Sequence, residues 1–165
     1  MESSAVMETA TAAIDTAFDE FYELLTSPNG SSLEEYKRGF FSKIDAISRI
    51  INESPDRDDL EERFFELCSL LEDSIMHQRT RKKPLGYAGD FLLIDWIYTE
   101  KTASDIRGAF FDRLFHSFEA SWSVRNRKAY FIRKCRELAA RGEPVRMLNL
   151  GCGSCRDVLE AMETI

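Results

Sequence analysis

Apolar residues recur at intervals of three and four positions along most of the chain, which is the spacing of one face of an amphipathic helix. Side chains suited to helix N-caps precede several of these stretches, namely Ser32, Asp90 and Ser104. Ser32 also forms a capping box with Glu35, three positions later. The first three helices are expected to pack as an antiparallel bundle. The pattern as a whole predicts helices over residues 4–25, 33–51, 60–75, 91–98, 105–118 and 121–140.

The pattern changes near residue 145. Residues 145–150 (VRMLNL) form a short apolar run between Pro144 and Gly151, which is typical of a strand buried on both faces of a parallel sheet. A glycine-containing loop at 151–154 and helical spacing over 155–165 follow. We therefore expect a mainly α chain, a helical bundle that runs into the first strand, loop and helix of a Rossmann-like α/β domain.

Three regions follow from this reading. Residues 1–78 are expected to form the helical bundle, residues 79–143 a second helical region that covers a substrate and contains the GYAGD loop, and residues 144–165 the start of the Rossmann-like domain. A single parallel strand has no partner for its backbone hydrogen bonds. The sequence is therefore expected to be an excerpt or a truncated product of a longer polypeptide.

Composition narrows the classes of protein. With 44% hydrophobic and 31% charged residues, the chain has the make-up of a soluble globular protein. It lacks an apolar run of the ~18 residues that a membrane span needs and an N-terminal secretion signal, so we expect a cytoplasmic protein without a membrane span. Four cysteines in that compartment are expected to be reduced thiols.

Charge is divided unevenly between the two halves of the chain. The net charge of −7 argues against binding to nucleic acid, which requires a basic surface. Residues 1–75 carry 18 acidic and 6 basic side chains, whereas residues 76–165 carry 11 acidic and 16 basic ones. The second half therefore suits an anionic small molecule, although solvated faces of long helices explain the same charges.

The glycine loop is the clearest candidate for a binding site. In the run LNLGCGSC, Gly151 and Gly153 permit a backbone conformation and a close approach that a Cβ atom would prevent. The start of the next helix offers unpaired N–H groups to a nucleotide-like ligand. A tight turn without a ligand is the alternative.

This run resembles motif I of class I S-adenosylmethionine-dependent methyltransferases, an acidic residue followed by x-G-x-G-x-G. The sequence departs from the motif at Asn149, where the family has Asp or Glu, and at Cys155, where the third glycine would stand. The resemblance implies S-adenosylmethionine as cofactor, with Asn149, Gly151, Cys152 and Gly153 beside it.

A second resemblance covers about residues 80–160. The segments KPLGYAGDF (83–91) and SVRNRKAYF (123–131), followed by the glycine loop, are similar to a bacterial methyltransferase family described as extracellular-factor or 3-hydroxypalmitic acid methyl ester biosynthesis proteins. This resemblance implies methylation of a carboxylate, either of a hydroxy fatty acid or of another small acid. No catalytic residue is assigned, because a carboxylate is already an adequate nucleophile near neutral pH.

Four residues of these two segments are further candidates for the cofactor site. Tyr87 offers a hydroxyl, and Asp90 either caps the next helix or faces the site. Arg125 or Asn126 would bind a carboxylate of the cofactor or the substrate, unless the arginine forms only a surface salt bridge. The two histidines, Cys68 and Cys135 lack the spacing of metal ligands, so no metal site is expected.

Other functions compete with methyl transfer. Cys152-Gly153-Ser154-Cys155 is a C-x-x-C sequence, as in thioredoxin-type redox pairs. Residues 1–140 would also suit a non-catalytic helical module for sensing or partner binding, and a homo-oligomer is compatible with either function. The acidic group that would bind the cofactor ribose is expected after residue 165, so this chain alone is expected to be inactive.

Overall fold

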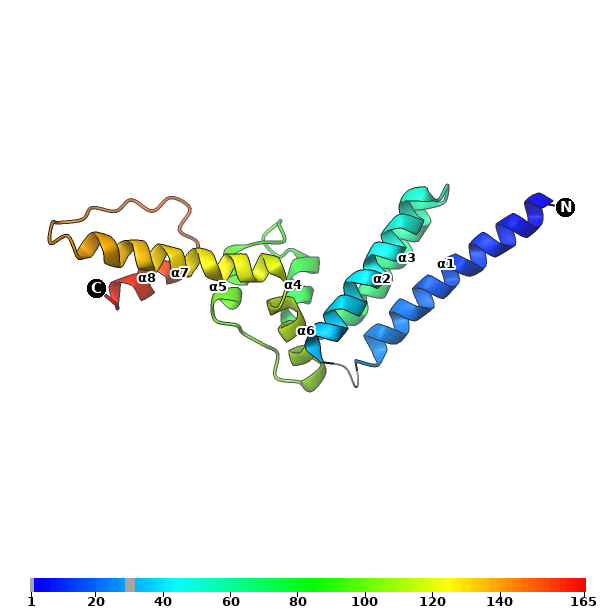
Figure 1. The fold of residues 1–165 in the computed structure, drawn as a ribbon, viewed down its shortest axis with the longest axis horizontal. Helices are drawn as coiled ribbons and strands as arrows, with labels where there is room; N and C mark the ends of the chain where they lie inside the picture. The colour runs from blue at the N-terminus through cyan, green and yellow to red at the C-terminus, as the bar shows by residue number, and fades with distance from the viewer. Residues whose placement is uncertain (1, 29–31) are drawn as a thin grey trace. The chain divides into compact units, whose positions relative to one another are not determined.

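The structure, a computed structural model, describes residues 2–28 and 32–165, with side chains described from residue 11 onward. Its regular elements are helices, and no strand is formed by the residues described (Figure 1). The chain divides into two compact units, Met1–Glu72 and Asp73–Ile165. In the part of the chain described, no helix is both long and apolar enough to cross a membrane.

The first unit confirms the predicted antiparallel helices. Helix α1 (Glu2–Thr26) packs against α2 (Leu33–Glu53), which packs in turn against α3 (Arg57–Leu67), and successive helices run in opposite directions (Figure 1). Phe21 lies at the centre, with its ring centroid 5.7 Å from that of Phe40 and 5.8 Å from that of Phe64. The other buried apolar side chains of this core are Phe18, Leu25, Tyr36, Ile47, Ile51, Leu60 and Leu71.

Helix α2 begins as its sequence predicts. The Glu35 N–H donates to Ser32 Oγ at 3.3 Å, and the Ser32 N–H donates to the Glu35 carboxylate at 3.0 Å. The Tyr36 hydroxyl donates to the Leu24 carbonyl at 2.8 Å and ties the start of α2 to the last turns of α1.

The helix predicted over residues 60–75 is wrong in its extent. Helix α3 ends at Leu67, a 3₁₀ turn, η1 (Cys68–Leu71), follows, and a new helix, α4 (Ile75–Lys82), begins after Ser74. Ser74 has an extended backbone, and its hydroxyl accepts the His77 N–H at 3.1 Å while donating to Asp112 at 2.5 Å. The cap requires this extended conformation, so the helix cannot continue through Ser74.

The second unit contains α4, α5 (Phe91–Tyr98), α6 (Ile106–His116), α7 (Glu119–Ala139) and α8 (Arg156–Met162). Helix α4 packs against α5 and α6, and α7 packs against α5, α6 and α8. Its buried apolar side chains are Met76, Leu93, Ile97, Phe111, Leu114, Cys135 and Ala161.

Asp112 joins three segments of this unit. Its buried carboxylate accepts hydrogen bonds from the Ser74 hydroxyl, from the Met76 N–H at 3.1 Å and from the Ala103 N–H at 2.7 Å. The N-cap of α6 is Asp105 and not the predicted Ser104, because the Asp105 carboxylate accepts the Gly108 N–H at 2.6 Å.

The strand expected over residues 145–150 is not formed in the described structure. A strand requires a neighbour for its backbone hydrogen bonds, and no described segment pairs with this one. Its apolar side chains are consequently exposed, by 83% at Leu148 and 82% at Leu150. The boundary expected at residues 78/79 falls inside α4, and residues 144–165 belong to the second compact unit.

Candidate functional site

A cleft in the second unit brings together two of the segments selected from the sequence, the GYAGD loop and the glycine loop. Its volume is about 450 Å³. The loop before α5 and the glycine loop before α8 form its walls together with side chains of α5 and α7. The lining residues are Tyr87, Gly89, Phe91, Ile94, Tyr98, Arg127, Asn149, Leu150, Gly151, Cys152, Gly153, Ser154 and Asp157.

The loop before α5 is fixed at both ends. Lys83 ends α4 in a left-handed conformation, and its carbonyl accepts the Gly86 N–H at 2.8 Å. At the other end, Asp90 caps α5 by accepting the N–H groups of Leu92 and Leu93, both at 3.0 Å. Tyr87 and Gly89, which lie between these two fixed points, line the cleft.

Asp90 is fully buried and does not line the cleft. Arg79 forms an ion pair with it, with Nε to Oδ1 at 2.9 Å and Nη2 to Oδ2 at 2.8 Å. Burial by itself would raise the pKa of Asp90, but the hydrogen bonds from Arg79 and from the first turn of α5 outweigh burial and lower it. Of the two roles considered for Asp90, the structure therefore supports helix capping.

The glycine loop adopts left-handed backbone conformations that glycine tolerates. The φ angles are +66° at Gly151 and +55° at Gly153. A Cβ atom at Gly153 would lie 3.3 Å from the Phe91 Cβ, so this position allows the loop to approach α5 closely. Cys155 also has a positive φ, +55°, at the position where the motif has its third glycine.

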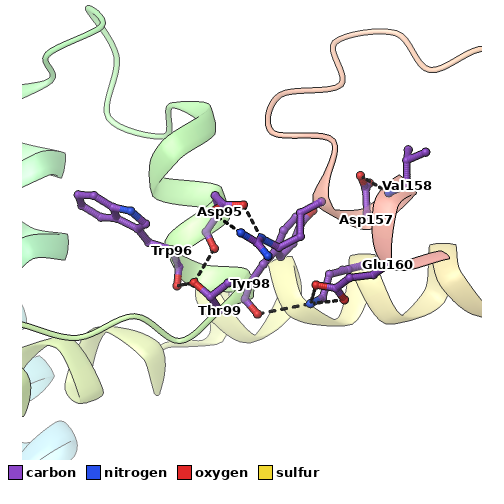
Figure 2. A network of polar contacts seen from close by, with 9 residues as sticks. Asp95, Trp96, Tyr98, Thr99, Asp157, Val158 and Glu160 are labelled. Atoms are coloured by element: carbon purple, nitrogen blue, oxygen red, sulfur yellow. Dashed lines mark hydrogen bonds and ion pairs between the residues drawn. The ribbon is translucent and has the colours of Figure 1, made fainter. Parts of the chain in front are cut away.

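Ion pairs hold the glycine loop and α8 against α5 and α7 (Figure 2). Arg156 binds the Asp95 carboxylate through two nitrogens, at 2.5 and 3.0 Å. The hydrogen bond from Arg156 is the largest of the contributions that lower the pKa of Asp95, and Ser154 adds another hydrogen bond. Lys128 of α7 lies 2.8 Å from the Glu160 carboxylate of α8. Helix α8, which directly follows the glycine loop, is thus tied to both α5 and α7.

The two arginines of the SVRNRKAYF segment point in different directions. Arg125 donates to the His116 carbonyl at 2.9 Å and lies 3.6 Å from Glu100, away from the cleft. Asn126 is exposed and does not line the cleft either. Arg127 does, with its guanidinium 3.4 Å from the Tyr98 hydroxyl. The cationic residue of the cleft is therefore Arg127 and not the predicted Arg125.

Five of the residues predicted for the cofactor site line the cleft, and eight other lining residues were not predicted. Tyr87, Asn149, Gly151, Cys152 and Gly153 line the cleft. A signal for others was present in the sequence: Phe91, Ile94 and Tyr98 share one face of α5, separate from the face that buries Leu93 and Ile97. The lining residues missed were Gly89, Phe91, Ile94, Tyr98, Arg127, Leu150, Ser154 and Asp157.

Both histidines lie away from the cleft. The His77 ring packs edge-on against Phe115, and His116 Nε2 lies 2.9 Å from the Lys101 carbonyl. Among the side chains described, those of residues 11–28 and 32–165, no group of three or more His, Cys, Asp and Glu could hold a metal ion.

Comparison of the chain with protein-family models, with curated proteins and with solved structures found no match.

Proposed function

We propose that the cleft binds S-adenosylmethionine and that the chain contributes this site to an S-adenosylmethionine-dependent methyltransferase. The observation that supports the proposal most strongly is the convergence of two segments that are far apart in sequence. Tyr87 and Gly89 of the GYAGD loop face the same space as Asn149, Gly151 and Gly153 of the glycine loop. A volume of about 450 Å³ also lies within the range of about 300–1,000 Å³ that is usual for small-molecule sites.

The chemistry of the lining suits each part of this cofactor. The aromatic rings of Tyr87, Phe91 and Tyr98 offer surfaces on which a purine can stack, and aromatic faces attract a sulfonium cation. Arg127 offers two N–H groups in a plane to the amino-acid carboxylate. The carboxylate of Asp157 is negatively charged and can accept a hydrogen bond from a hydroxyl or an ammonium group of the cofactor.

The glycine loop contributes backbone groups and not side chains. Without Cβ atoms at Gly151 and Gly153, a ligand can approach the backbone N–H groups closely. The ion pair between Arg156 and Asp95 fixes the loop before a ligand arrives, which lowers the entropic cost of binding.

The proposed acceptor is a carboxylate, from a hydroxy fatty acid or another small acid. Residues 76–165 carry five more basic than acidic side chains, which favours an anionic substrate. Bound in the cleft, the cofactor would supply an electrophilic methyl group. The protein's part is to align the acceptor oxygen with that group, and a carboxylate needs no general base.

Calorimetric titration of S-adenosylmethionine into the protein tests the proposal. We expect saturable binding at micromolar ligand that Arg127→Ala weakens at least about tenfold, because a charge-assisted contact is lost. Arg133→Ala is the matched control: Arg133 lies on the same helix and pairs with the exposed Glu137 outside the cleft, so affinity should not change. Absence of binding would overturn the proposal and favour a helical partner-binding module.

A further inference from the structure

The C-x-x-C sequence forms a tight turn in the wall of the cleft. The Cys155 N–H donates to the Cys152 carbonyl at 2.8 Å, which closes a four-residue turn with Gly153 at its first central position. The Cα atoms at the ends of such a turn lie less than about 7 Å apart, and a disulfide requires about 4.4–6.8 Å. The backbone therefore already holds the two cysteines at the separation that a disulfide needs.

The side chains of the two cysteines are also placed for the formation of a disulfide. Cys152 is exposed and lines the cleft, whereas Cys155 is half-buried and does not line it. The thiols hydrogen-bond to each other, and this contact is the main cause that raises the pKa of Cys155. Cys152 is consequently the thiol that an external reagent reaches first, and Cys155 lies beside it with its proton retained.

The other two cysteines do not share this arrangement. Cys135 is buried in α7, and Cys68 belongs to the other compact unit. Neither lines the cleft. A bridge between Cys152 and Cys155 is thus the one that the local geometry favours.

We propose that Cys152 and Cys155 form a reversible disulfide, with a small-molecule disulfide such as oxidised glutathione as the oxidant. The Cys152 thiolate attacks one sulfur of the oxidant, the oxidant's S–S bond breaks, and one glutathione thiolate leaves. Cys155 then releases its proton to water, its sulfur attacks Cys152, and the second glutathione thiolate leaves. The two cysteines together lose two protons and two electrons, and the oxidant gains the electrons.

The bridge would change the cleft directly. It removes the exposed Cys152 thiol from the lining and cross-links the turn that contains Gly153 and Ser154. Because Ser154 hydrogen-bonds to Asp95, the cross-link acts on a loop that is already anchored to α5. Formation of the bridge does not depend on which ligand the cleft binds.

Oxidation of the protein in glutathione buffers, followed by intact-mass analysis and peptide mapping, tests the proposal. The native protein should lose the mass of two hydrogen atoms without a glutathione adduct, and the map should join Cys152 to Cys155. Dithiothreitol should restore the original mass. The equilibrium constant for bridge formation should be at least about tenfold larger in the folded protein than in urea, because folding holds the turn.

Two variants make the test specific. Cys155→Ser should trap the glutathione adduct on Cys152, with at least about tenfold more adduct than the native protein, because the resolving thiol is absent. Cys68→Ser is the matched control and should form the bridge as the native protein does. A stable adduct on Cys152 in the native protein, a bridge to Cys68 or Cys135, or equal constants in buffer and urea would each overturn the proposal.

Discussion

Acidification should destabilise the second compact unit because His77 is neutral in the folded protein. The ring packs edge-on against Phe115, with centroids 5.3 Å apart, and against Phe118 at 6.3 Å. Burial lowers the pKa of His77 from 6.5 to about 4, and the nearby charge of Asp112 offsets only part of that effect. Between these two values the unfolded chain binds a proton that the folded protein does not. Stability is therefore complete above about pH 6.5 and declines as the pH falls towards 4.

The size of the effect follows from the two pKa values. Across the whole interval the loss is about 3 kcal/mol, and at about pH 5 it is about 2 kcal/mol relative to about pH 7.5. Urea unfolding followed by tryptophan fluorescence is the appropriate assay, because Trp96 and Trp122 are the chain's two tryptophans and both belong to the second unit.

Carboxylates also titrate in this pH range and contribute to the loss of stability. The contribution of His77 is therefore isolated by comparing the native protein with the His77→Phe variant. Phenylalanine keeps an aromatic ring against Phe115 and Phe118 and cannot be protonated. The loss of stability between about pH 7.5 and pH 5 should be about 2 kcal/mol smaller in this variant than in the native protein. An equal loss in the two proteins would refute the assignment of a buried, neutral His77.

Four further substitutions test local backbone conformations and the anchoring of the glycine loop. Cys155→Gly should stabilise the second unit by up to about 1 kcal/mol in urea unfolding, because a glycine relieves the positive φ; marked destabilisation would argue against this conformation. Gly108→Ala should destabilise by about 1–3 kcal/mol in thermal unfolding followed by circular dichroism, because its Cβ would clash with the backbone carbonyl of Asp73 and would also lie 2.7 Å from the Asp105 carboxylate. Gly39→Ala, where no atom lies within 4 Å of the added Cβ, should instead stabilise by about 0.5–1 kcal/mol. Asp95→Asn should speed tryptic cleavage in the exposed segment before the glycine loop, because Arg156 loses its charged partner; an unchanged rate would show that the ion pair does not anchor the loop.

Helices and caps with local causes could be predicted from the sequence. The capping box of Ser32 and Glu35 involves residues three positions apart, and Asp90 caps the residues that directly follow it. The break before Ser74 could not be predicted in this way, because it depends on Asp112, which is 38 positions away. The same reasoning explains the unformed strand, since pairing in a sheet depends on segments that are distant in sequence.

The candidate site also contains features that a short run of sequence reveals and features that depend on distant residues. The glycine loop and Tyr87 could be found from motifs, because glycine and aromatic residues are recognisable in a short run of sequence. Whether Arg125 or Arg127 faces the cleft depends on the rotation of α7 about its axis, which packing sets. Arg125 is held by the His116 carbonyl on one side of the helix, and Arg127 therefore lies on another side, beside Tyr98.

The most direct test of the proposal that the cleft binds a cofactor is an NMR titration of the protein, labelled with ¹⁵N at glycine, with S-adenosylhomocysteine. The amide signals of Gly89, Gly151 and Gly153, which line the cleft, should shift progressively and saturate. The signals of Gly39 and Gly108, which do not line it, should remain in place. Shifts confined to the latter two glycines, or no shifts at saturating ligand, would contradict the proposal that this cleft binds the cofactor.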